Sequence, residues 1–317
     1  MPEAIIETGL EKTVRLSREE LSEGWADVGR MPRVMATVKM GAKTDLGRVR
    51  DNNEDKFDFF EPEDPQTLAL KGSFYAVADG MGGHSAGQIA CELALKTVLA
   101  VYYAEPSADR ESCLRQAVRE ANSLIYDTAM VIPDRQGMGT TLTAAVLCED
   151  TLTIAQVGDS RAYLLRGGQI SQVTEDHSWV AEQVRLGAMT LAEAQTSPFR
   201  NIITRSVGTA ATVEADLFTQ TVQAGDIFLL CSDGLTGHVE ADEIQAIILE
   251  NSPSAAAALL IETANERGGR DNITALVLAV RSLTPYAGAD AAAGDAPKDL
   301  SKGPSKDEKP SRWGRRK

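Results

Sequence analysis

The stretch VADGMGGHSAG, residues 77–87, ends an apolar run with Asp79 and follows it with four glycines and a histidine. The residues that lead into it, SFYAVA, predict a buried β-strand that ends at this aspartate. Glycine has no Cβ, so the backbone after Asp79 can approach other groups closely. The stretch therefore predicts a strand that carries a carboxylate to the edge of a sheet, beside a backbone carbonyl that could also act as a ligand.

Acidic residues recur at strand ends elsewhere in the chain. TLTIAQVGD ends with Asp159, DIFLLCSD ends with Asp233, and NITALVLAV begins directly after Asp271. The segment NNED adds Glu54 and Asp55. One aspartate at such a place is an ordinary turn residue, but several at one rim of a sheet would repel one another. A bound cation would remove the repulsion, and oxygen ligands without a histidine or cysteine cluster favour Mg²⁺ or Mn²⁺.

Helix and strand signals come in blocks along the chain. Apolar residues at three- and four-residue spacing predict amphipathic helices over 87–103 and 111–131. Short β-branched runs between 141 and 174 predict a meander of antiparallel strands. A strand, two helices and a closing strand are expected over 226–234, 241–251, 253–268 and 272–280. Such blocks indicate α+β layers rather than regular βαβ winding.

Composition excludes several classes of function. The chain has 317 residues, of which 43% are hydrophobic and 25% charged, and its formal net charge is −14. This acidity argues against a protein that binds nucleic acid or lies on an anionic membrane. We find no secretory signal and no apolar run long enough to cross a bilayer. The four cysteines lack a CxxC spacing, so we expect buried reduced thiols and a cytoplasmic location.

Composition also shifts at both ends of the chain. Residues 1–37 are charged and mixed, and we expect an N-terminal arm that is partly helical or flexible. Residues 284–317 are rich in Ala, Gly, Pro and Lys and carry eight basic and five acidic residues, which predicts a disordered basic tail. A folded domain is expected between them, over residues 38–283.

Seven motifs follow one another along the chain. They are RDNNED (50–55), VADGMGGHSAG (77–87), MGTTLTAAVL (138–147), VGDSRAYLLRGGQI (157–170), ITRSVGT (203–209), FLLCSDGL (228–235) and GGRDNITALVL (268–278). Each motif alone is a weak signal, but seven in order between about residues 40 and 281 are specific. In order and approximate spacing they resemble the bacterial metal-dependent serine/threonine protein phosphatases of type 2C. The resemblance implies a two-sheet antiparallel β-sandwich flanked by helices on both sides, in α-β-β-α layers.

The resemblance also implies roles for individual residues. The ligands of two divalent ions, Mn²⁺ or Mg²⁺, correspond to Asp55, Asp79, the Gly80 carbonyl, Asp233 and Asp271. Glu54 matches a residue that orients water, and Asp159 matches, with Asp233, a weaker third metal site. Arg50 matches the arginine that holds the phosphate, for which its planar fork is suited. Two such ions lower the pKa of a bridging water, which attacks phosphorus without a covalent intermediate.

The general acid is left open. Eukaryotic members of the family carry a histidine where Met81 stands, whereas His84 lies three residues further on. Either His84 or a metal-bound water would donate a proton to the leaving serine or threonine oxygen. His177 and His238 lie in loop-like stretches without ligand spacing, so neither is assigned a role. Residues 176–206 match the flap over the cleft in bacterial members and are expected to affect substrate choice.

The expected activity is hydrolysis of phosphoserine and phosphothreonine in proteins, by a monomer that opposes a serine/threonine kinase. One alternative is a phosphoprotein-binding scaffold with little or no catalysis, and another is a phosphatase for small esters. The retained aspartates of the expected metal shell favour catalysis over the scaffold. Cys113 and Arg119 have the CxxxxxR spacing of cysteine phosphatases, but CLRQAVR has no glycine to form an anion-binding loop.

Overall fold

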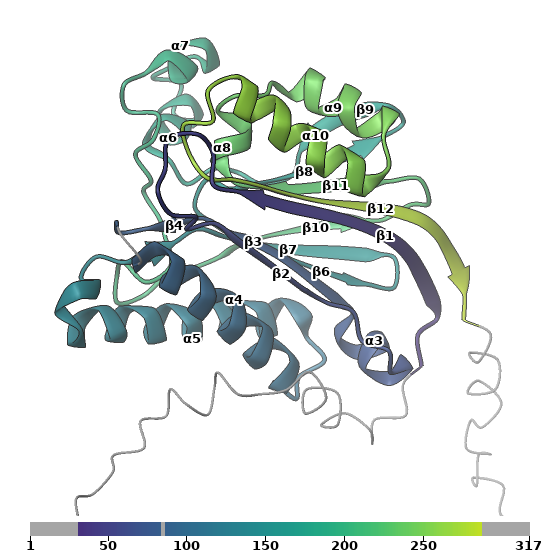
Figure 1. The fold of residues 1–317 in the computed structure, drawn as a ribbon. Helices are drawn as coiled ribbons and strands as arrows, with labels where there is room; N and C mark the ends of the chain where they lie inside the picture. Colours follow the sequence, from purple (N-terminus) through teal and green to yellow (C-terminus); the bar gives the residue numbers. More distant parts are fainter. Residues whose placement is uncertain (1–30, 84–85, 287–317) are drawn as a thin grey trace, which may run out of the picture.

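Two five-stranded antiparallel sheets lie face to face in the computed structural model, which describes residues 31–83 and 86–286 (Figure 1). The first sheet contains, in spatial order, β1 (Val34–Asp45), β12 (Ile273–Pro285), β11 (Ile227–Cys231), β8 (Arg161–Arg166) and β9 (Gln169–Gln172). The second contains β10 (Asp216–Thr221), β7 (Thr151–Val157), β6 (Leu142–Cys148), β3 (Ser73–Ala78) and β2 (Lys56–Phe60). The short strands β4 (Gly80–Met81) and β5 (Gly139–Thr140) pair beside the second sheet.

Helices cover the outer face of each sheet, so the expected α+β sandwich with α-β-β-α layers is confirmed (Figure 1). Those over the second sheet are α4 (Ala86–Ala104) and α5 (Arg110–Val131), with α3 (Pro65–Lys71) near β6. Those over the first sheet are α8 (Asp233–Thr236), α9 (Ala241–Glu250) and α10 (Pro253–Glu266). The remaining helices are η1 (Pro133–Arg135), α6 (Trp179–Arg185) and α7 (Leu191–Thr196). In the described part of the chain, no helix combines the length and the apolarity that crossing a membrane requires.

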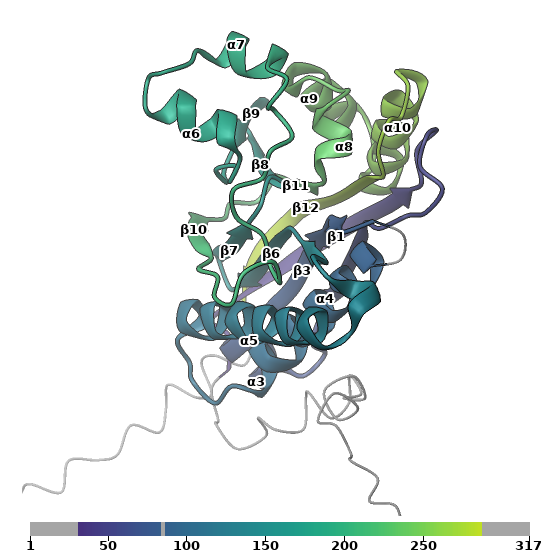
Figure 2. The same ribbon diagram turned by 90° about the vertical axis from the view of Figure 1, so that its left-hand side faces the viewer.

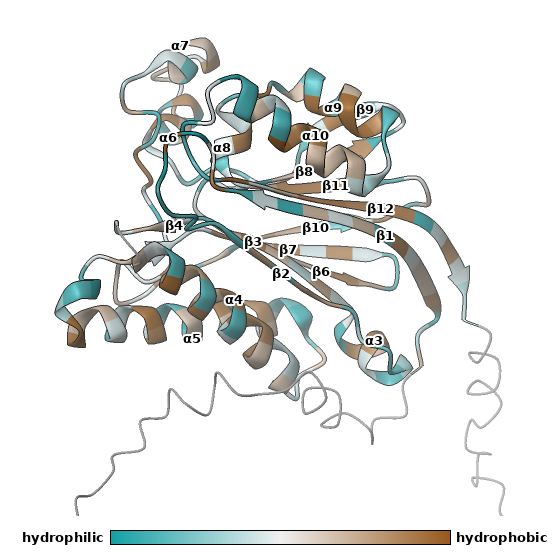
Figure 3. Ribbon diagram, in the orientation of Figure 1, coloured by the Kyte–Doolittle hydropathy of each residue, from teal (hydrophilic) through white to brown (hydrophobic). Residues whose placement is uncertain are grey.

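Three hydrophobic cores separate the four layers. On β3, Phe74 packs toward α4 and α5, whereas its neighbour Tyr75 packs between the two sheets. On β12, Val277 faces the helices of the first sheet and Leu276 faces the second sheet. Successive side chains of a strand point to opposite faces, so central strands covered on both faces are continuously apolar. Figure 3 shows this hydrophobic colour along the strands and hydrophilic colour along the loop from β1 to β2.

The helices expected over 87–103, 111–131, 241–251 and 253–268 are confirmed within a few residues of their ends. The expected single meander between 141 and 174 is wrong, because β6 pairs with β7 in one sheet and β8 pairs with β9 in the other. The chain changes sheets at the turn Gly158–Ser160. The four cysteines are buried and free, as expected.

The strands extend past the expected domain limits of 38 and 283. Val34 at the start of β1 pairs with Pro285 at the end of β12, so both ends of the described body belong to one pair of strands. Composition alone does not reveal this pairing, because its two strands lie at opposite ends of the described chain. Most of the expected arm, 1–37, and of the expected tail, 284–317, lies outside the described residues.

Close contact between α10 and β1 depends on Gly41. A Cβ at this position would overlap the backbone of Pro253 and Ser254 at the start of α10. We expect Gly41→Ala to lower the free energy of unfolding by about 1–3 kcal/mol, because backbone cannot yield as a flexible side chain would. Urea unfolding in EDTA would measure this. Lys39→Ala, at an exposed position of the same strand, is the control, and an equal loss in both variants would contradict the explanation.

Candidate metal centre

Aspartates from both sheets meet at one end of the sandwich, onto which Figure 2 looks. Asp79 follows β3 and Asp159 follows the end of β7 in the second sheet. Asp233 follows the end of β11 in the first sheet, and Asp271 precedes β12. The negative charges of Asp55, Asp233, Asp159 and Asp271 all act on the carboxylate of Asp79. The structure therefore brings together the five aspartates that sequence places near one rim.

Burial and mutual repulsion disfavour the charged forms of these carboxylates. Asp55 is fully buried and Asp159 is 6% exposed, while Asp79 and Asp233 are half-buried. Burial, reinforced by the neighbouring carboxylates, raises the pKa of all four groups above the ordinary value for aspartate. Nearby positive charge would favour the ionised form of these buried carboxylates.

Asp55 is held through one of its two oxygens. Ser232 Oγ donates a hydrogen bond to Asp55 Oδ2 (2.6 Å) and accepts one from Thr274 N (2.9 Å). Asp55 Oδ1 and Asp159 Oδ1 are buried and find no hydrogen-bond partner within residues 31–83 and 86–286. A buried oxygen without a partner is costly unless a cation satisfies it. These two atoms are therefore suited to bind a positively charged ligand.

Arg50 extends toward the aspartates from the loop between β1 and β2. Its Nη2 lies 2.7 Å from Asp271 Oδ2, and the two side chains are 53% and 37% exposed. The charges of Asp79 and Glu54 also act on the guanidinium and, with Asp271, raise its pKa. Arg50 thus lies at the solvent-facing side of the acidic group, where an incoming anion could reach it.

Asn272 organises the loop that carries Glu54. Its Oδ1 accepts a hydrogen bond from Glu54 N (2.8 Å), and its Nδ2 donates to Leu46 O (2.9 Å) and Asn52 O (3.0 Å). Asn272 was not predicted from the sequence to have a role, and its position next to Asp271 is the only signal of one there.

Two glycines allow the backbone beside Asp79 to come close to Glu54. A Cβ at Gly80 would lie 2.8 Å from Glu54 O and would overlap the Gly87 carbonyl. A Cβ at Gly87 would lie 2.7 Å from the Gly80 carbonyl carbon and would overlap Glu54 Oε2. Only glycine fits at either position, as the sequence predicted for the backbone after Asp79.

Threonine and serine hydroxyls connect the segment that carries Asp79 with the turn that carries Asp159. Thr141 N donates to Asp79 O (2.8 Å), and Asp79 N donates to Thr141 Oγ1 (3.0 Å). Thr141 Oγ1 also lies 2.7 Å from Ser160 Oγ, beside Asp159. Thr140 Oγ1 donates to Asp79 O (2.9 Å). The motif MGTTL signalled this position, but its threonines were not given the role of orienting two aspartates.

His84, the expected candidate for the general acid, lies outside the described residues. Within 176–206, the expected flap, the ring of Trp179 at the start of α6 contacts the ring of Phe199, which lies in the loop after α7, with the ring centroids 5.3 Å apart. The isolated bridge between Ser178 and Ile203 closes this segment at its base.

The donor set fits a hard divalent cation. It consists of carboxylate oxygens and the Gly80 carbonyl, and two of the carboxylate oxygens are buried without partners among the described residues. No three or more Asp, Glu, His or Cys side chains in the described ranges form a ready group for one ion. Arg50 and Ser232 engage oxygens of Asp271 and Asp55. A cation bound at Asp271 would compete with Arg50 for that carboxylate.

Comparison with known proteins identifies the family. The family described as protein phosphatase 2C matches residues 42–273. The chain is 42% identical over 248 residues to the serine/threonine phosphatase stp of Listeria monocytogenes. The aligned region covers 76% of this chain and 95% of the Listeria protein.

Solved structures agree with this assignment. The serine/threonine phosphatase of S. agalactiae superimposes with a TM-score of 0.71 at 35% identity. The match covers 77% of this chain and 100% of the S. agalactiae chain. The catalytic domain of PstP, solved in complex with two manganese ions, superimposes with a TM-score of 0.68 at 36% identity. The match covers 78% of this chain and 100% of the PstP chain. The chain therefore belongs to the protein phosphatase 2C family of serine/threonine phosphatases.

Proposed function

We propose that the chain hydrolyses phosphoserine and phosphothreonine in proteins at a binuclear centre of Mn²⁺ or Mg²⁺. The observation that carries this proposal is the convergence of aspartates from both sheets, with Asp55 Oδ1 buried and without a partner among the described residues. The two manganese ions in the structure of the PstP catalytic domain support the same centre here.

The two cations would be held by Asp55, Asp79, the Gly80 carbonyl, Asp233 and Asp271. Asp159 would join Asp233 in a weaker third site. Among the charged neighbours of Asp159, Asp233 has the largest effect and raises its pKa. When bound, the cations supply Lewis acidity that activates water and neutralises the phosphate. Ser232 would keep Asp55 in place, because its hydroxyl donates a hydrogen bond to the Asp55 carboxylate. Thr141 would do the same for Asp79, because its hydroxyl accepts a hydrogen bond from the backbone N–H of Asp79.

The other residues of the site act on the substrate and on the water. Arg50 would bind the phosphate through its fork of N–H donors, since it lies at the exposed side of the group. Glu54 would orient the attacking water, since its carboxylate lies against the backbone of Gly87 beside Gly80. The proton for the leaving oxygen would come from His84 or from a water bound to a cation.

The biological setting is part of the same proposal. The substrates are phosphorylated proteins, the activity opposes a serine/threonine kinase, and the enzyme acts as a cytoplasmic monomer. Residues 176–206 would act as a flap that influences which phosphoproteins bind. The catalytic domain spans about 38–283, and β1 and β12 extend it to Val34 and Pro285. We expect the rest of the arm and of the basic tail to be dispensable for chemistry.

Phosphate release from a phosphothreonine peptide tests the proposal. The purified full chain would be assayed with EDTA, Mg²⁺ or Mn²⁺, beside a small phosphate ester under the same conditions. We expect release that requires the divalent cation and is abolished by EDTA. Turnover of the ester with none of the peptide would indicate a small-molecule phosphatase. A folded protein that binds the phosphopeptide without releasing phosphate under any metal would instead indicate the scaffold.

A further inference from the structure

His177 connects two parts of the molecule at the acidic end of the sandwich. Its backbone N donates a hydrogen bond to Gly158 O (2.9 Å), and its backbone O accepts one from Thr204 N (2.8 Å). Gly158 directly precedes Asp159, and Thr204 lies near the end of the segment 176–206. One residue is therefore bonded both to the turn that carries Asp159 and to the base of that segment.

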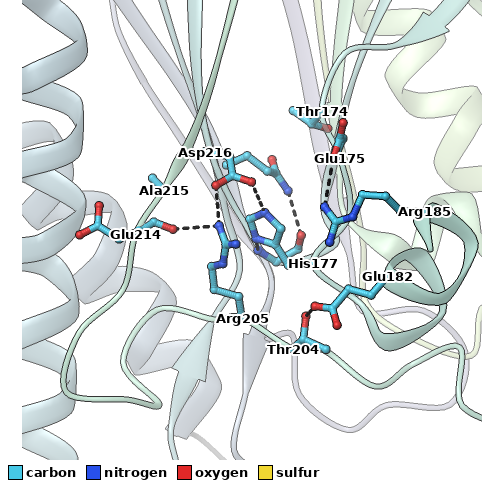
Figure 4. Close-up of polar contacts among 12 residues, drawn as sticks. Thr174, Glu175, His177, Glu182, Arg185, Thr204, Arg205, Glu214, Ala215 and Asp216 are labelled. Carbon is cyan, nitrogen blue, oxygen red and sulfur yellow. Dashed lines mark hydrogen bonds and ion pairs between the residues drawn. The ribbon is translucent and has the colours of Figure 1, made fainter.

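The imidazole ring of His177 strengthens the same connection (Figure 4). The ring is buried, and its Nδ1 accepts a hydrogen bond from Gly158 N (3.1 Å). Its Nε2 lies 3.0 Å from Asp216 Oδ2, while Asp216 Oδ1 accepts from Arg205 Nη1 (2.6 Å). Both ring nitrogens are thus engaged, one by the Asp159 turn and the other by β10.

These contacts specify the neutral form of the ring and one tautomer. A backbone N–H can only donate, so Nδ1 must be unprotonated, and the proton lies on Nε2 where Asp216 accepts it. Burial lowers the pKa of His177, and the positive charge of Arg205 acts in the same direction. The carboxylates of Asp216 and Asp176 act in the opposite direction.

The turn that His177 holds is tightly constrained on its other sides. Gly158 has a φ of 103°, and a Cβ there would lie 2.6 Å from Thr141 Cβ. Gln156 Nε2 donates to Gly158 O (3.1 Å) and to Ser160 O (2.6 Å). Asp159 lies between these bonded residues, and its buried Oδ1 has no partner in the described ranges. The direction of its carboxylate therefore depends on how the backbone of the turn is held.

We propose that His177 is a positioning residue for cation binding: by accepting the Gly158 N–H at Nδ1, it holds the turn so that Asp159 can bind a cation together with Asp233. The inference rests on the proposed role of Asp159 as a ligand of the weaker site. Through Thr204, the same residue ties the base of the segment 176–206 to that turn.

Binding of Mn²⁺ to the full chain, followed by the electron paramagnetic resonance signal of free Mn²⁺, tests the inference without measuring activity. Three substitutions separate the two ring nitrogens. His177→Phe keeps a ring but removes both nitrogens, His177→Asn keeps an acceptor near Nδ1, and His177→Gln keeps an amide near Nε2. We expect the Phe and Gln variants to weaken the weaker Mn²⁺ binding by about tenfold or more, with the tighter binding unchanged. The Asn variant should retain the wild-type affinity.

Asp159→Asn, which should remove the weaker binding, distinguishes failure of the inference from failure of the proposed site. If Asp159→Asn removes it while the His177 Phe and Gln variants bind as the wild type does, the positioning role is wrong. If neither Asp159→Asn nor the His177 variants alter Mn²⁺ binding, Asp159 is not a ligand and the inference falls with it. Should the Phe variant fail to fold, the Asn and Gln variants decide, because equal losses in both would exclude the Nδ1 contact.

Discussion

Asp233→Asn is expected to abolish metal-dependent turnover while leaving the metal-free protein at least as stable as the wild type. A catalytic metal supplies several kcal/mol of transition-state stabilisation. Its loss corresponds to a decrease in kcat of about a thousandfold or more. The stability should change in the opposite direction, because burial and the charge of Asp271 disfavour an ionised Asp233 in the folded protein. Phosphopeptide assays with Mn²⁺ and urea unfolding in EDTA measure the two effects.

A matched control removes the same charge elsewhere. Asp242 lies in the first turn of α9 and is exposed, so Asp242→Asn should leave both turnover and stability close to the wild-type values. Full activity in Asp233→Asn would exclude this residue as a ligand. A variant that is inactive and also less stable in EDTA would mean that Asp233 mainly supports the fold.

Strand-end aspartates were predictable because the signal is local. An apolar run followed by Asp and Gly indicates both the strand and the place where it ends, as at Asp79 and Asp233. The number of such runs suggested that these ends could meet at one rim, and the repulsion between like charges held there indicated a bound cation. The glycine requirement at Gly80 was accessible for the same reason, since the absence of a Cβ shows directly in the sequence.

The groups that hold these aspartates were not predictable, because their partners are distant in the chain. Glu54 N and its acceptor Asn272 are 218 residues apart, and Ser232 and Asp55 are 177 apart. The sequence around His177 shows no ligand spacing, so it gives no local signal of a role. Its contacts lie 19 residues away at Gly158 and 39 away at Asp216, in different elements. The contacts of such a residue arise only when the fold brings distant segments together.

The topology shows the same division between local and distant information. Each hairpin, β6 with β7 and β8 with β9, follows from its own turn and apolar runs. The change of sheet between them does not, because Gly158–Ser160 has the composition of an ordinary turn. β1 was also missed, since its alternating polar residues belong to a strand at the edge of a sheet.

Arg50→Ala is expected to raise KM for the phosphopeptide about tenfold to a hundredfold, with a smaller effect on kcat. Hydrogen bonds to charged groups contribute about 1.5–3 kcal/mol, and about 1.4 kcal/mol corresponds to a tenfold change. Arg48→Ala, an exposed position of the same loop, removes an equal charge and is the control. Steady-state kinetics with Mn²⁺ would compare them, and an equal rise in KM for both would point to long-range charge rather than direct contact.

The ion pair between Arg50 and Asp271 lets a second measurement separate phosphate binding from damage to the metal centre. The pair is largely exposed, so losing it should cost the fold little. Because Arg50 and a cation would compete for Asp271, Arg50→Ala should leave Mn²⁺ affinity unchanged or make it tighter. Weaker phosphopeptide binding together with undiminished Mn²⁺ binding is the pattern expected of a phosphate ligand. A fall in Mn²⁺ affinity would show that Arg50 instead supports the shape of the acidic group.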